Sequence, residues 1–264
     1  MAAKLSANLP ELVMVTGASS GLGTAICAHL IASKAKVIGI DLGDAPDLGK
    51  VGGYEHVKGD VTSEAFWQTF SGRLEKIATK SMGLVTSAAI LDVGTIVDFD
   101  KAMMEKTLSV NVIGTALAFK SVIPRMVANG GGVIVAIGSV DATFAEQQLS
   151  VYAASKGAVR QLTRTVAMDH ARQGIRANVL SPGPMMAGLF ERHMKSANDP
   201  TRFHASRAAR QPNGRILPPG EVADAALFLL SDASRAINGA DIIADGGLTT
   251  SFDFRTGAEG ASVS

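Results

Sequence analysis

The chain has 264 residues, of which 47% are hydrophobic and 19% charged, and its formal net charge at pH 7 is +1. This composition is typical of a globular protein with a large core, and the nearly neutral charge offers no electrostatic footprint for nucleic acid or an anionic membrane surface. The length fits one α/β domain, so we expect the partners to be small molecules or further copies of the chain.

The N-terminal region and the cysteine and histidine content limit the possible locations and cofactors. Met1–Glu11 is interrupted by polar residues and proline and does not resemble a signal peptide. No segment approaches the about 18 to 20 apolar residues of a membrane helix. Cys27 is the only cysteine, which excludes a disulfide framework, and the five histidines lack metal-ligand spacing. We therefore expect a cytoplasmic protein with no metal site and no membrane contact.

The first predicted strand, Leu12–Val15, leads into a glycine-rich turn and then a helix over Thr24–Ser33. Glycines in this order permit a tight turn and close backbone approach, while the N-terminus of the helix faces a pyrophosphate. A plain strand-to-helix turn is the alternative. The residues predicted to bind a dinucleotide here are Gly17, Ser19, Ser20, Gly21, Leu22 and Gly23.

The second predicted strand, Lys36–Ile40, ends at Asp41, which bears on the choice of cofactor. An acidic residue about 20 residues after the glycines accepts hydrogen bonds from ribose hydroxyls and repels a 2′-phosphate. No Arg or Lys stands in the glycine turn or directly after Asp41. The pattern favours NAD over NADP, and a solvated turn aspartate is the alternative.

Strands and helices continue to alternate in the middle of the chain. Asn111 stands in an apolar stretch of the longest predicted helix and must find hydrogen-bonding partners. The expected elements are a loop over 43–53, a strand over 55–58, a helix from about 62 to about 78, a strand over 83–88 and a long helix over 98–126.

The most apolar predicted strand, Val133–Ile137, ends at Ser139, and a helix then continues to about Gln173. The sixth strand, Arg176–Leu180, is stopped by Pro182-Gly183. This alternation predicts a parallel sheet covered by helices on both faces, with the ligand at the carboxyl ends of the strands. We expect one domain over residues 1–250 and a tail over 251–264 in which Phe252 and Phe254 are anchored.

Tyr152 and Lys156 are four residues apart in a predicted helix, so the phenol and the ammonium lie on one helical face. A nearby cation favours the phenolate and lowers the pKa of tyrosine from its usual value of about 10. The pair therefore predicts a general base, although an amphipathic helix with no catalytic role would show the same spacing.

Taken together, these motifs resemble the short-chain dehydrogenase/reductase superfamily over almost the whole chain. The residues that carry the resemblance are Thr16–Gly23, Asp60-Val61, Asn111, Ser139, Tyr152, Lys156, Pro182-Gly183 and Asp245-Gly246-Gly247. The resemblance implies a single-domain Rossmann-type doubly wound fold, a homotetramer or homodimer, and hydride transfer between a secondary alcohol or ketone and NAD.

The resemblance also implies roles for individual residues. Tyr152 would be the general base, Lys156 would lower its pKa and bind the nicotinamide ribose, Ser139 would orient the substrate oxygen, and Asn111 would hold a water in a proton relay. The further cofactor-binding residues that it implies are Asp60, Val61, Ser87, Ala88, Tyr152, Lys156, Pro182, Gly183 and Met185.

Two departures from the family pattern lie beside the cofactor. Thr86-Ser87-Ala88-Ala89 stands where the family usually has Asn-Asn-Ala-Gly, and we expect Ser87 to replace part of the lost hydrogen bonding. Ala187 stands where a threonine is common, which removes a hydroxyl that would meet the nicotinamide carboxamide.

The segment Met185–Phe203 mixes apolar and polar residues, which predicts an amphipathic lid over an apolar cyclic or aromatic alcohol. The predicted substrate-binding residues are Ser139, Asp141, Leu149, Tyr152, Met186 and Phe190. Two alternatives stay open: an NADH-dependent ketone reductase, and an NAD-sensing protein without turnover.

Overall fold

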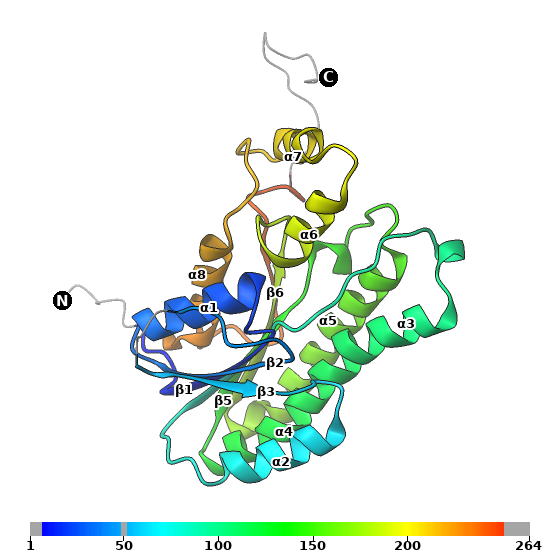
Figure 1. The fold of residues 1–264 in the computed structure, drawn as a ribbon. Coiled ribbons are helices and arrows are strands. Elements are labelled where there is room, and N and C mark those ends of the chain that lie inside the picture. Colours follow the sequence, from blue (N-terminus) through cyan, green and yellow to red (C-terminus); the bar gives the residue numbers. More distant parts are fainter. Residues whose placement is uncertain (1–6, 49–51, 251–264) are drawn as a thin grey trace, which may run out of the picture.

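The computed structural model describes residues 7–48 and 52–250, which form a seven-stranded parallel sheet with helices on both faces (Figure 1). The strand order is β3-β2-β1-β4-β5-β6-β7, which confirms the predicted doubly wound fold. The order reverses between β1 and β4, where such folds bind their ligands. The strands are β1 (Leu12–Thr16), β2 (Lys36–Asp41), β3 (Tyr54–Lys58), β4 (Met82–Thr86), β5 (Gly132–Ile137), β6 (Ile175–Pro182) and β7 (Asp241–Ala244).

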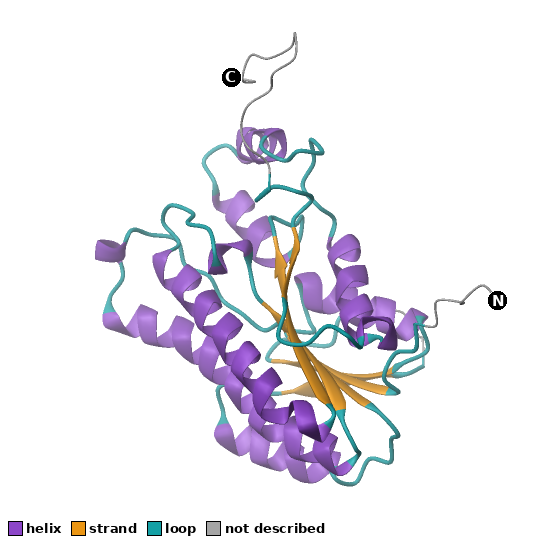
Figure 2. Cartoon of the chain, turned by 180° about the vertical axis from the view of Figure 1, so that it is seen from behind, coloured by secondary structure: helices purple, strands orange, loops and turns teal. Residues whose placement is uncertain are grey.

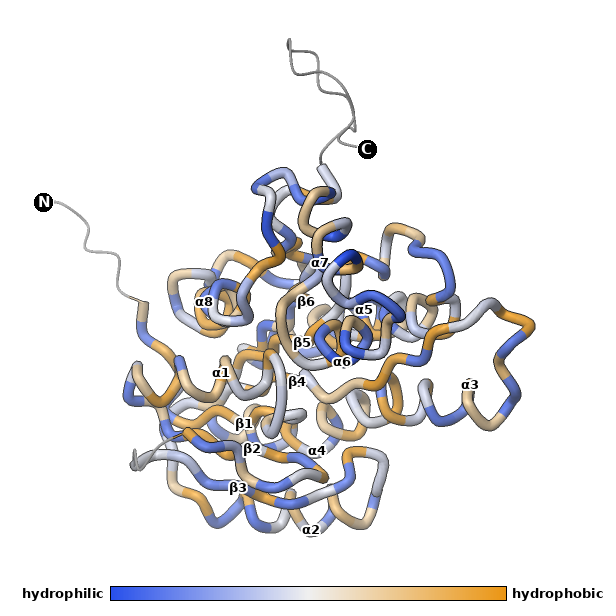
Figure 3. Tube along the Cα trace, turned by 45° about the horizontal axis from the view of Figure 1, so that its top comes forward, coloured by the Kyte–Doolittle hydropathy of each residue, from blue (hydrophilic) through white to orange (hydrophobic). Residues whose placement is uncertain are grey.

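Two hydrophobic cores lie on the two faces of the sheet because side chains alternate along each strand. In β1, Val13 and Val15 belong to one core, whereas Leu12 and Met14 belong to the other. The first core packs under α1 (Gly21–Ala32) and α8 (Pro219–Leu230), and the second under α2 (Glu64–Leu74), α4 (Gly114–Ala128) and α5 (Ser150–His170). Figure 2 shows these two helical layers from behind, and Figure 3 shows hydrophobic and hydrophilic residues alternating along the helices.

The longest helical segment differs from the continuous helix expected over 98–126. It begins at α3 (Lys101–Leu108), because the side chain of Asp100 accepts a hydrogen bond from the Met103 N–H and caps the helix. Asp98 instead belongs to a preceding 3-10 turn. A π-helical turn, Ser109–Ile113, joins α3 to α4. Asn111 lies in this turn, and π turns of this kind are frequent at functional sites.

The expectation that no segment comes near the length of a membrane helix needs a correction. Within the described residues, the helix Lys101–Ala128 is long and apolar enough by length and composition to cross a membrane. Half of the most apolar 18-residue stretch of this helix is buried in the protein, as for a core helix. This helix contains scattered polar residues, so it is apolar on average without an uninterrupted apolar run.

Several element boundaries also differ from the predictions. Helix α2 ends at Leu74 rather than near Ala78, because the N–H groups of the next residues turn back to carbonyls three and four residues earlier. Strand β4 ends at Thr86, two residues early. Helix α8 and strand β7 had no predicted counterpart. The expected anchoring of Phe252 and Phe254 falls outside the described residues.

Two further helices, α6 (Gly188–Ser196) and α7 (Pro200–Ala209), lie beyond the carboxyl end of β6 (Figure 1). They occupy most of the segment predicted to form a lid. Helix α7 begins with Pro200 after Asp199, whose side chain accepts a hydrogen bond from the Arg202 N–H. Helix α6 has Ala187 at its N-cap and therefore no side-chain cap.

Candidate active site

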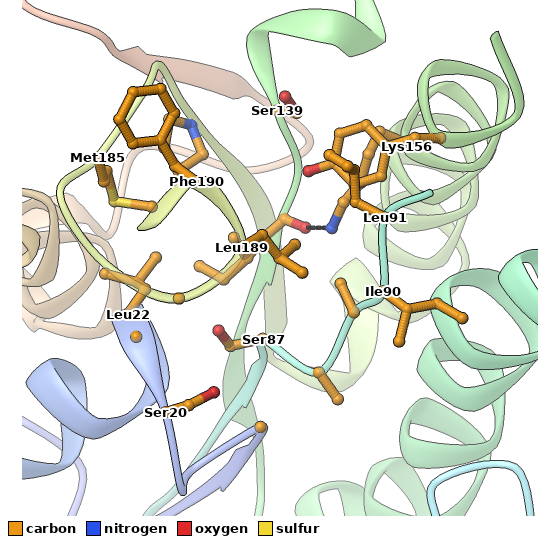
Figure 4. A pocket seen from close by; sticks show the side chains of 18 of the residues that line it. Ser20, Leu22, Ser87, Ile90, Leu91, Ser139, Lys156, Met185, Leu189 and Phe190 are labelled. Carbon is orange, nitrogen blue, oxygen red and sulfur yellow. Dashed lines mark hydrogen bonds between the residues drawn. The ribbon is translucent and has the colours of Figure 1, made fainter. Parts of the chain in front are cut away.

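A cavity of ≈ 560 Å³ lies at the carboxyl ends of the strands, between the glycine-rich turn, α5 and the lid helices (Figure 4). Most of the residues predicted for cofactor and substrate come together along it. The predicted residues that line the cavity are Gly17, Ser20, Gly21, Leu22, Asp41, Asp60, Val61, Ser87, Ala88, Ser139, Asp141, Leu149, Tyr152, Lys156, Pro182, Gly183, Met185 and Phe190. Four predicted residues do not line it: Ser19, Gly23, Asn111 and Met186.

The glycine-rich turn has the geometry that close approach of a ligand requires. Gly17 has φ +69° and Gly21 φ +56°, a left-handed conformation that side chains disfavour. A Cβ on Gly17 would lie 2.7 Å from the backbone nitrogen of Ala88. Helix α1 begins here with Ser20 as its N-cap residue, and the Ser20 side chain makes no capping hydrogen bond. The first N–H groups of α1 therefore suit an anionic group such as a pyrophosphate.

Gly23 and Ser19 shape this turn instead of lining the cavity. A Cβ on Gly23 would lie 2.0 Å from the carbonyl oxygen of Gly17, so only glycine fits where the helix meets the strand. The Ser19 N–H donates to Asp41 (3.0 Å) and its hydroxyl donates to the carbonyl of Asp44 (2.7 Å). Both residues thus support the turn from outside.

Asp41 lies at the end of β2, beside the glycine-rich turn. Its carboxylate accepts hydrogen bonds from the N–H groups of Ser19 (3.0 Å) and Gly43 (2.8 Å), which hold it at the edge of the cavity. Lys58, its partner in the strand register, forms an ion pair with Asp44 (3.2 Å). The nearest cation in the sheet is thus engaged elsewhere, and a fixed negative charge faces this end of the cavity.

The Asp60 carboxylate accepts hydrogen bonds from the N–H and the hydroxyl of Thr62, each at 2.8 Å. At the other end of the cavity, a Cβ on Gly183 would lie 2.8 Å from the Cβ of Asp245. Asp245 also accepts a hydrogen bond from the Gly247 N–H (2.8 Å). The segment Asp245-Gly246-Gly247 therefore packs closely against Gly183.

Met185 and Met186 face different surroundings although they are adjacent. Met185 lines the cavity, whereas the Met186 N–H donates to the carbonyl of Leu217 (2.9 Å) and Met186 stays outside the cavity lining. The structure thus places Met186 outside the cavity lining, and its predicted contact with the substrate stays a prediction. The reason for this placement is extended pairing, since Met185 forms a bridge with Leu217 and successive side chains point to opposite sides.

Thr16 holds the backbone of the unusual Thr86-Ser87-Ala88 sequence against the end of β1. Its Oγ1 accepts the N–H groups of Ser87 (3.1 Å) and Ala88 (3.2 Å) and so joins the ends of β1 and β4. Thr16 is a buried residue whose role the sequence reasoning missed. Ser87 lines the cavity (Figure 4), and its expected share in the hydrogen bonding beside the cofactor stays a prediction.

Asn111 is buried and holds two neighbouring segments together. Its Nδ2 donates to the carbonyl of Ile90 (3.0 Å) and to Oγ of Ser155 (2.9 Å), and its Oδ1 accepts from the Ile90 N–H (2.9 Å). These bonds fix the loop after β4 against α5. Both ends of the amide are engaged within the protein, so Asn111 is a positioning residue here, and its place in a proton relay stays a prediction.

Tyr152 and Lys156 lie side by side on α5, as their spacing predicts. The Lys156 Nζ lies 5.7 Å from the centroid of the Tyr152 ring. It also donates a hydrogen bond to the carbonyl of Ile137 at the end of β5 (2.8 Å; Figure 4). Both residues are buried and both line the cavity.

The pKa of Tyr152 shifts in the opposite direction to the one expected from sequence. Burial raises this pKa above the usual value of 10, the negative charge of Asp141 raises it further, and a hydrogen bond with Ser139 opposes them. Burial also lowers the pKa of Lys156 from 10.5 to about 8, with Asp141 acting against it. In the protein alone, desolvation thus outweighs the effect of the lysine charge.

Ser139 and Asp141 form a pair beside Tyr152. The Ser139 hydroxyl donates to Oδ2 of Asp141 (3.0 Å) and accepts a hydrogen bond from the Asp141 N–H (3.2 Å). Burial raises the pKa of the Asp141 carboxyl. Glu146 and Arg207, which form an ion pair of 2.7 Å, also line the cavity. Sequence reasoning missed this pair because only the packing of α7 brings Arg207 to the loop that carries Glu146.

Apolar side chains from two directions complete the substrate end of the cavity. Met185 and Phe190 lie on one side, and Ile90 and Leu91 on the other (Figure 4). The Phe190 ring lies 5.7 Å, centroid to centroid, from the ring of Phe203, which joins α6 to α7. The lid therefore has a small aromatic core of its own.

Comparisons with known proteins agree with this geometry. A family model described as enoyl-(acyl carrier protein) reductase matches residues 17–249. The chain is 33% identical over 246 residues to 2-(S)-hydroxypropyl-CoM dehydrogenase 3 of Xanthobacter autotrophicus, covering 90% of this chain and 96% of the relative. It is 37% identical over 243 residues to galactitol 2-dehydrogenase (L-tagatose-forming) of Cereibacter sphaeroides, covering 89% and 93%. The ligand-free aldohexose dehydrogenase of Thermoplasma acidophilum has a TM-score of 0.86 and 30% identity, covering 94% and 98%.

Proposed function

We propose that this chain interconverts a secondary alcohol and a ketone with NAD, using Tyr152 as the general base. The premise is that the chain belongs to the short-chain dehydrogenase/reductase superfamily and is an alcohol dehydrogenase or ketone reductase acting on CH–OH groups. The observation that carries this proposal is the convergence of Ser139, Tyr152 and Lys156 on one cavity with the glycine-rich turn. The same residues serve oxidation and reduction, and their presence argues against an NAD sensor without turnover.

The residues of the cavity fit a dinucleotide. Gly17 and Gly21 form a tight turn in which a Cβ would meet the backbone of Ala88 or Gly188, and the uncapped start of α1 offers N–H donors to a pyrophosphate. Asp41 supports NAD over NADP, because its fixed carboxylate suits ribose hydroxyls and repels a 2′-phosphate. Asp60 and Val61 would then line the adenine side, with Pro182, Gly183 and Met185 at the nicotinamide side.

Tyr152 removes the hydroxyl proton of the alcohol in this proposal, so that the carbinol carbon can release hydride. Bound NAD supplies the hydride acceptor at the nicotinamide ring. Ser139 donates a hydrogen bond to the reacting oxygen and holds it beside the phenol. Lys156 is anchored on the Ile137 carbonyl, and its ammonium form favours the phenolate. In this proposal the same ammonium would bind the nicotinamide ribose.

The skeleton of the substrate is proposed to be apolar and cyclic or aromatic. The support is the lining of Leu149, Phe190, Ile90 and Leu91 around the catalytic residues. Assembly as a homotetramer or homodimer is part of the proposal, supported by Ile113 and Met168, whose large apolar side chains are exposed on the long helical segments. A cytoplasmic location also stays a prediction.

A panel of secondary alcohols, assayed with NAD and separately with NADP, tests the proposal by absorbance of the reduced cofactor. We expect NADH formation with at least one cyclic alcohol. The efficiency with NAD should be at least about tenfold higher than with NADP, which corresponds to a difference of about 1.4 kcal/mol in transition-state binding. Reduction of neither cofactor by any alcohol, together with no oxidation of NADH by the matching ketones, would refute the proposed activity.

A further inference from the structure

Asp141 lies beside the catalytic residues, and the reaction described above does not use it. It stands two residues after Ser139 in the 3-10 turn Val140–Ala142, and it lines the cavity in a half-buried position. Its Oδ2 accepts a hydrogen bond from the Ser139 hydroxyl. Arg207 of the lid lines the cavity near Asp141, and it is paired with Glu146. The Asp141 carboxylate therefore has no ion-pair partner within the described part of the chain.

The hydrogen bond between Ser139 and Asp141 conflicts with the role of Ser139 in the reaction. A serine hydroxyl has one proton to donate. The Ser139 hydroxyl donates its hydrogen bond to Asp141, whereas the proposed reaction requires that hydrogen bond to be donated to the reacting oxygen of the substrate. The oxygen of a substrate with a single hydroxyl must therefore compete with a carboxylate as the acceptor of this hydrogen bond, and hydrogen bonds to charged acceptors are the stronger ones. A substrate that brings a second donor for Asp141 removes this competition.

We propose that Asp141 determines specificity by accepting a hydrogen bond from a second hydroxyl group of the substrate, on the carbon next to the carbinol carbon. The enzyme then prefers vicinal diols over simple alcohols. This inference rests on the proposed function and names its substrate class more closely. Ser139 is released to the reacting oxygen while the neighbouring hydroxyl takes its place at Asp141.

The distances support a neighbouring hydroxyl. Ser139 Oγ and Asp141 Oδ2 are 3.0 Å apart. The reacting oxygen lies one O–H···O bond of about 2.7 Å from Ser139, and the second hydroxyl lies one such bond from Asp141. Hydroxyl oxygens on adjacent carbons are themselves about one hydrogen bond apart. The four oxygens thus close a circuit in which every side has the length of a hydrogen bond.

The surrounding charges favour a neutral hydroxyl over an anionic group at this place. Glu146 adds negative charge near Asp141, while Arg207 and Lys156 oppose it. Arg207 is already paired with Glu146, so a substrate carboxylate or phosphate beside Asp141 would meet the negative charges of Asp141 and Glu146. Apolar residues of the lining, Val140 and Leu149, contact the rest of the carbon skeleton.

Matched pairs of substrates test the inference: cis-1,2-cyclohexanediol against cyclohexanol, and 2,3-butanediol against 2-butanol, each with saturating NAD. We expect kcat/KM of the wild-type enzyme to favour the diol by about 10- to 100-fold, the range of a hydrogen bond to a charged group. Asp141→Ala should bring this ratio close to one, and Asp141→Asn, which keeps an acceptor oxygen without the charge, should give an intermediate ratio. Asp224→Ala, the loss of an exposed aspartate on α8, is the matched control and should keep the wild-type ratio.

The possible outcomes separate this inference from the activity itself. A wild-type ratio close to one would overturn the role of Asp141 while leaving the proposed oxidation intact. So would an Asp141→Ala variant that loses the same factor of kcat/KM on diol and simple alcohol, because Asp141 would then only position Ser139. If Asp141→Ala does not fold, the wild-type and Asp141→Asn ratios decide. Failure of all four alcohols with either cofactor would instead overturn the proposed function, and the inference with it.

Discussion

Replacing Lys156 with methionine is expected to change how the stability of the ligand-free protein depends on pH. Burial lowers the pKa of Lys156 from 10.5 to about 8. In the unfolded chain this lysine is exposed and keeps its proton up to the ordinary value. Between these two pKa values the unfolded state binds more protons than the folded state, so stability rises with pH. Below about pH 8 both states are protonated, and the folded protein carries the full penalty of a buried charge.

The magnitude follows from the difference between the two pKa values. A fall from 10.5 to about 8 corresponds to about 3 kcal/mol of free energy of unfolding, at about 1.4 kcal/mol per pKa unit. Between pH 7 and pH 10 the free energy of unfolding of the wild type should rise by about 2 to 3 kcal/mol as the buried ammonium loses its proton. Methionine has no charge and a similar length. The Lys156→Met variant also loses the hydrogen bond to the Ile137 carbonyl, which costs about 1 kcal/mol of stability. This loss is the same at every pH and does not change the slope of stability against pH.

Urea unfolding of the wild type and of Lys156→Met, in steps from pH 7 to pH 10, measures this difference. Protein concentration must be the same throughout, because assembly would couple stability to concentration. The pKa of Tyr152 is raised by burial in the same cavity, and its titration largely cancels between the two proteins. Parallel stability curves, or a wild type that loses stability relative to the variant as pH rises, would refute the argument from the buried charge.

Four other results are expected. Tyr152→Phe should lower kcat by about 10²–10⁴-fold with nearly unchanged NADH affinity, whereas Lys156→Ala should lower both kcat and NADH affinity. Steady-state rates measure the first quantity and fluorescence titration with NADH the second. A Tyr152→Phe variant that keeps a tenth of the activity would contradict the assignment of Tyr152 as the base. Asp41→Ala should reduce the preference for NAD over NADP, measured as the ratio of kcat/KM, and an unchanged ratio would remove Asp41 from this role. Ala187→Thr should supply the missing N-cap of α6 and raise the free energy of unfolding by about 0.5–1 kcal/mol in denaturant titrations, while Ala187→Val, of the same shape without the hydroxyl, should not. Light scattering at micromolar concentration should give the mass of a tetramer or dimer, and a monomer would refute assembly through the long helices.

Features that depend on local chain geometry were predictable from the sequence. Tyr152 and Lys156 share a helical face because of their spacing, and Gly17 and Gly21 take the left-handed conformations that a tight turn demands. The alternation of apolar strands with helices likewise predicted the parallel sheet. In these cases a few neighbouring residues contain the whole physical reason.

Features that depend on packing were not predictable. Whether Met185 or Met186 faces the cavity is decided by pairing with Leu217, which follows them at a distance in the sequence. The direction of the Tyr152 pKa shift is decided by burial and by Asp141, which spacing to Lys156 does not reveal. Strand β7 is short and became recognisable only through its register with β6.

Helix α8 was missed for a different reason, because the signals for it are present in the sequence. Pro219 stands in its first turn, where proline is favoured, and Glu221 adds the acidic residue typical of a helix start. An apolar run then continues to Leu230. The residues after the lid therefore contain the local signals for the start of this helix.

The π turn between α3 and α4 contains one residue more than a regular α-helical turn over the same length of helix. Each residue of an α-helix turns the chain by about 100°. Deleting one residue from Ser109–Ile113 would convert the segment into a regular helix and rotate one flank against the other by about that angle. Lys106 would then no longer line the cavity in its present orientation, and the Asn111 amide would lose its register with Ile90 and Ser155. The extra residue thus sets the rotation of α4 relative to α3. A regular helix without it would have an uninterrupted hydrogen-bond pattern but would lose the present positions of Lys106 and Asn111.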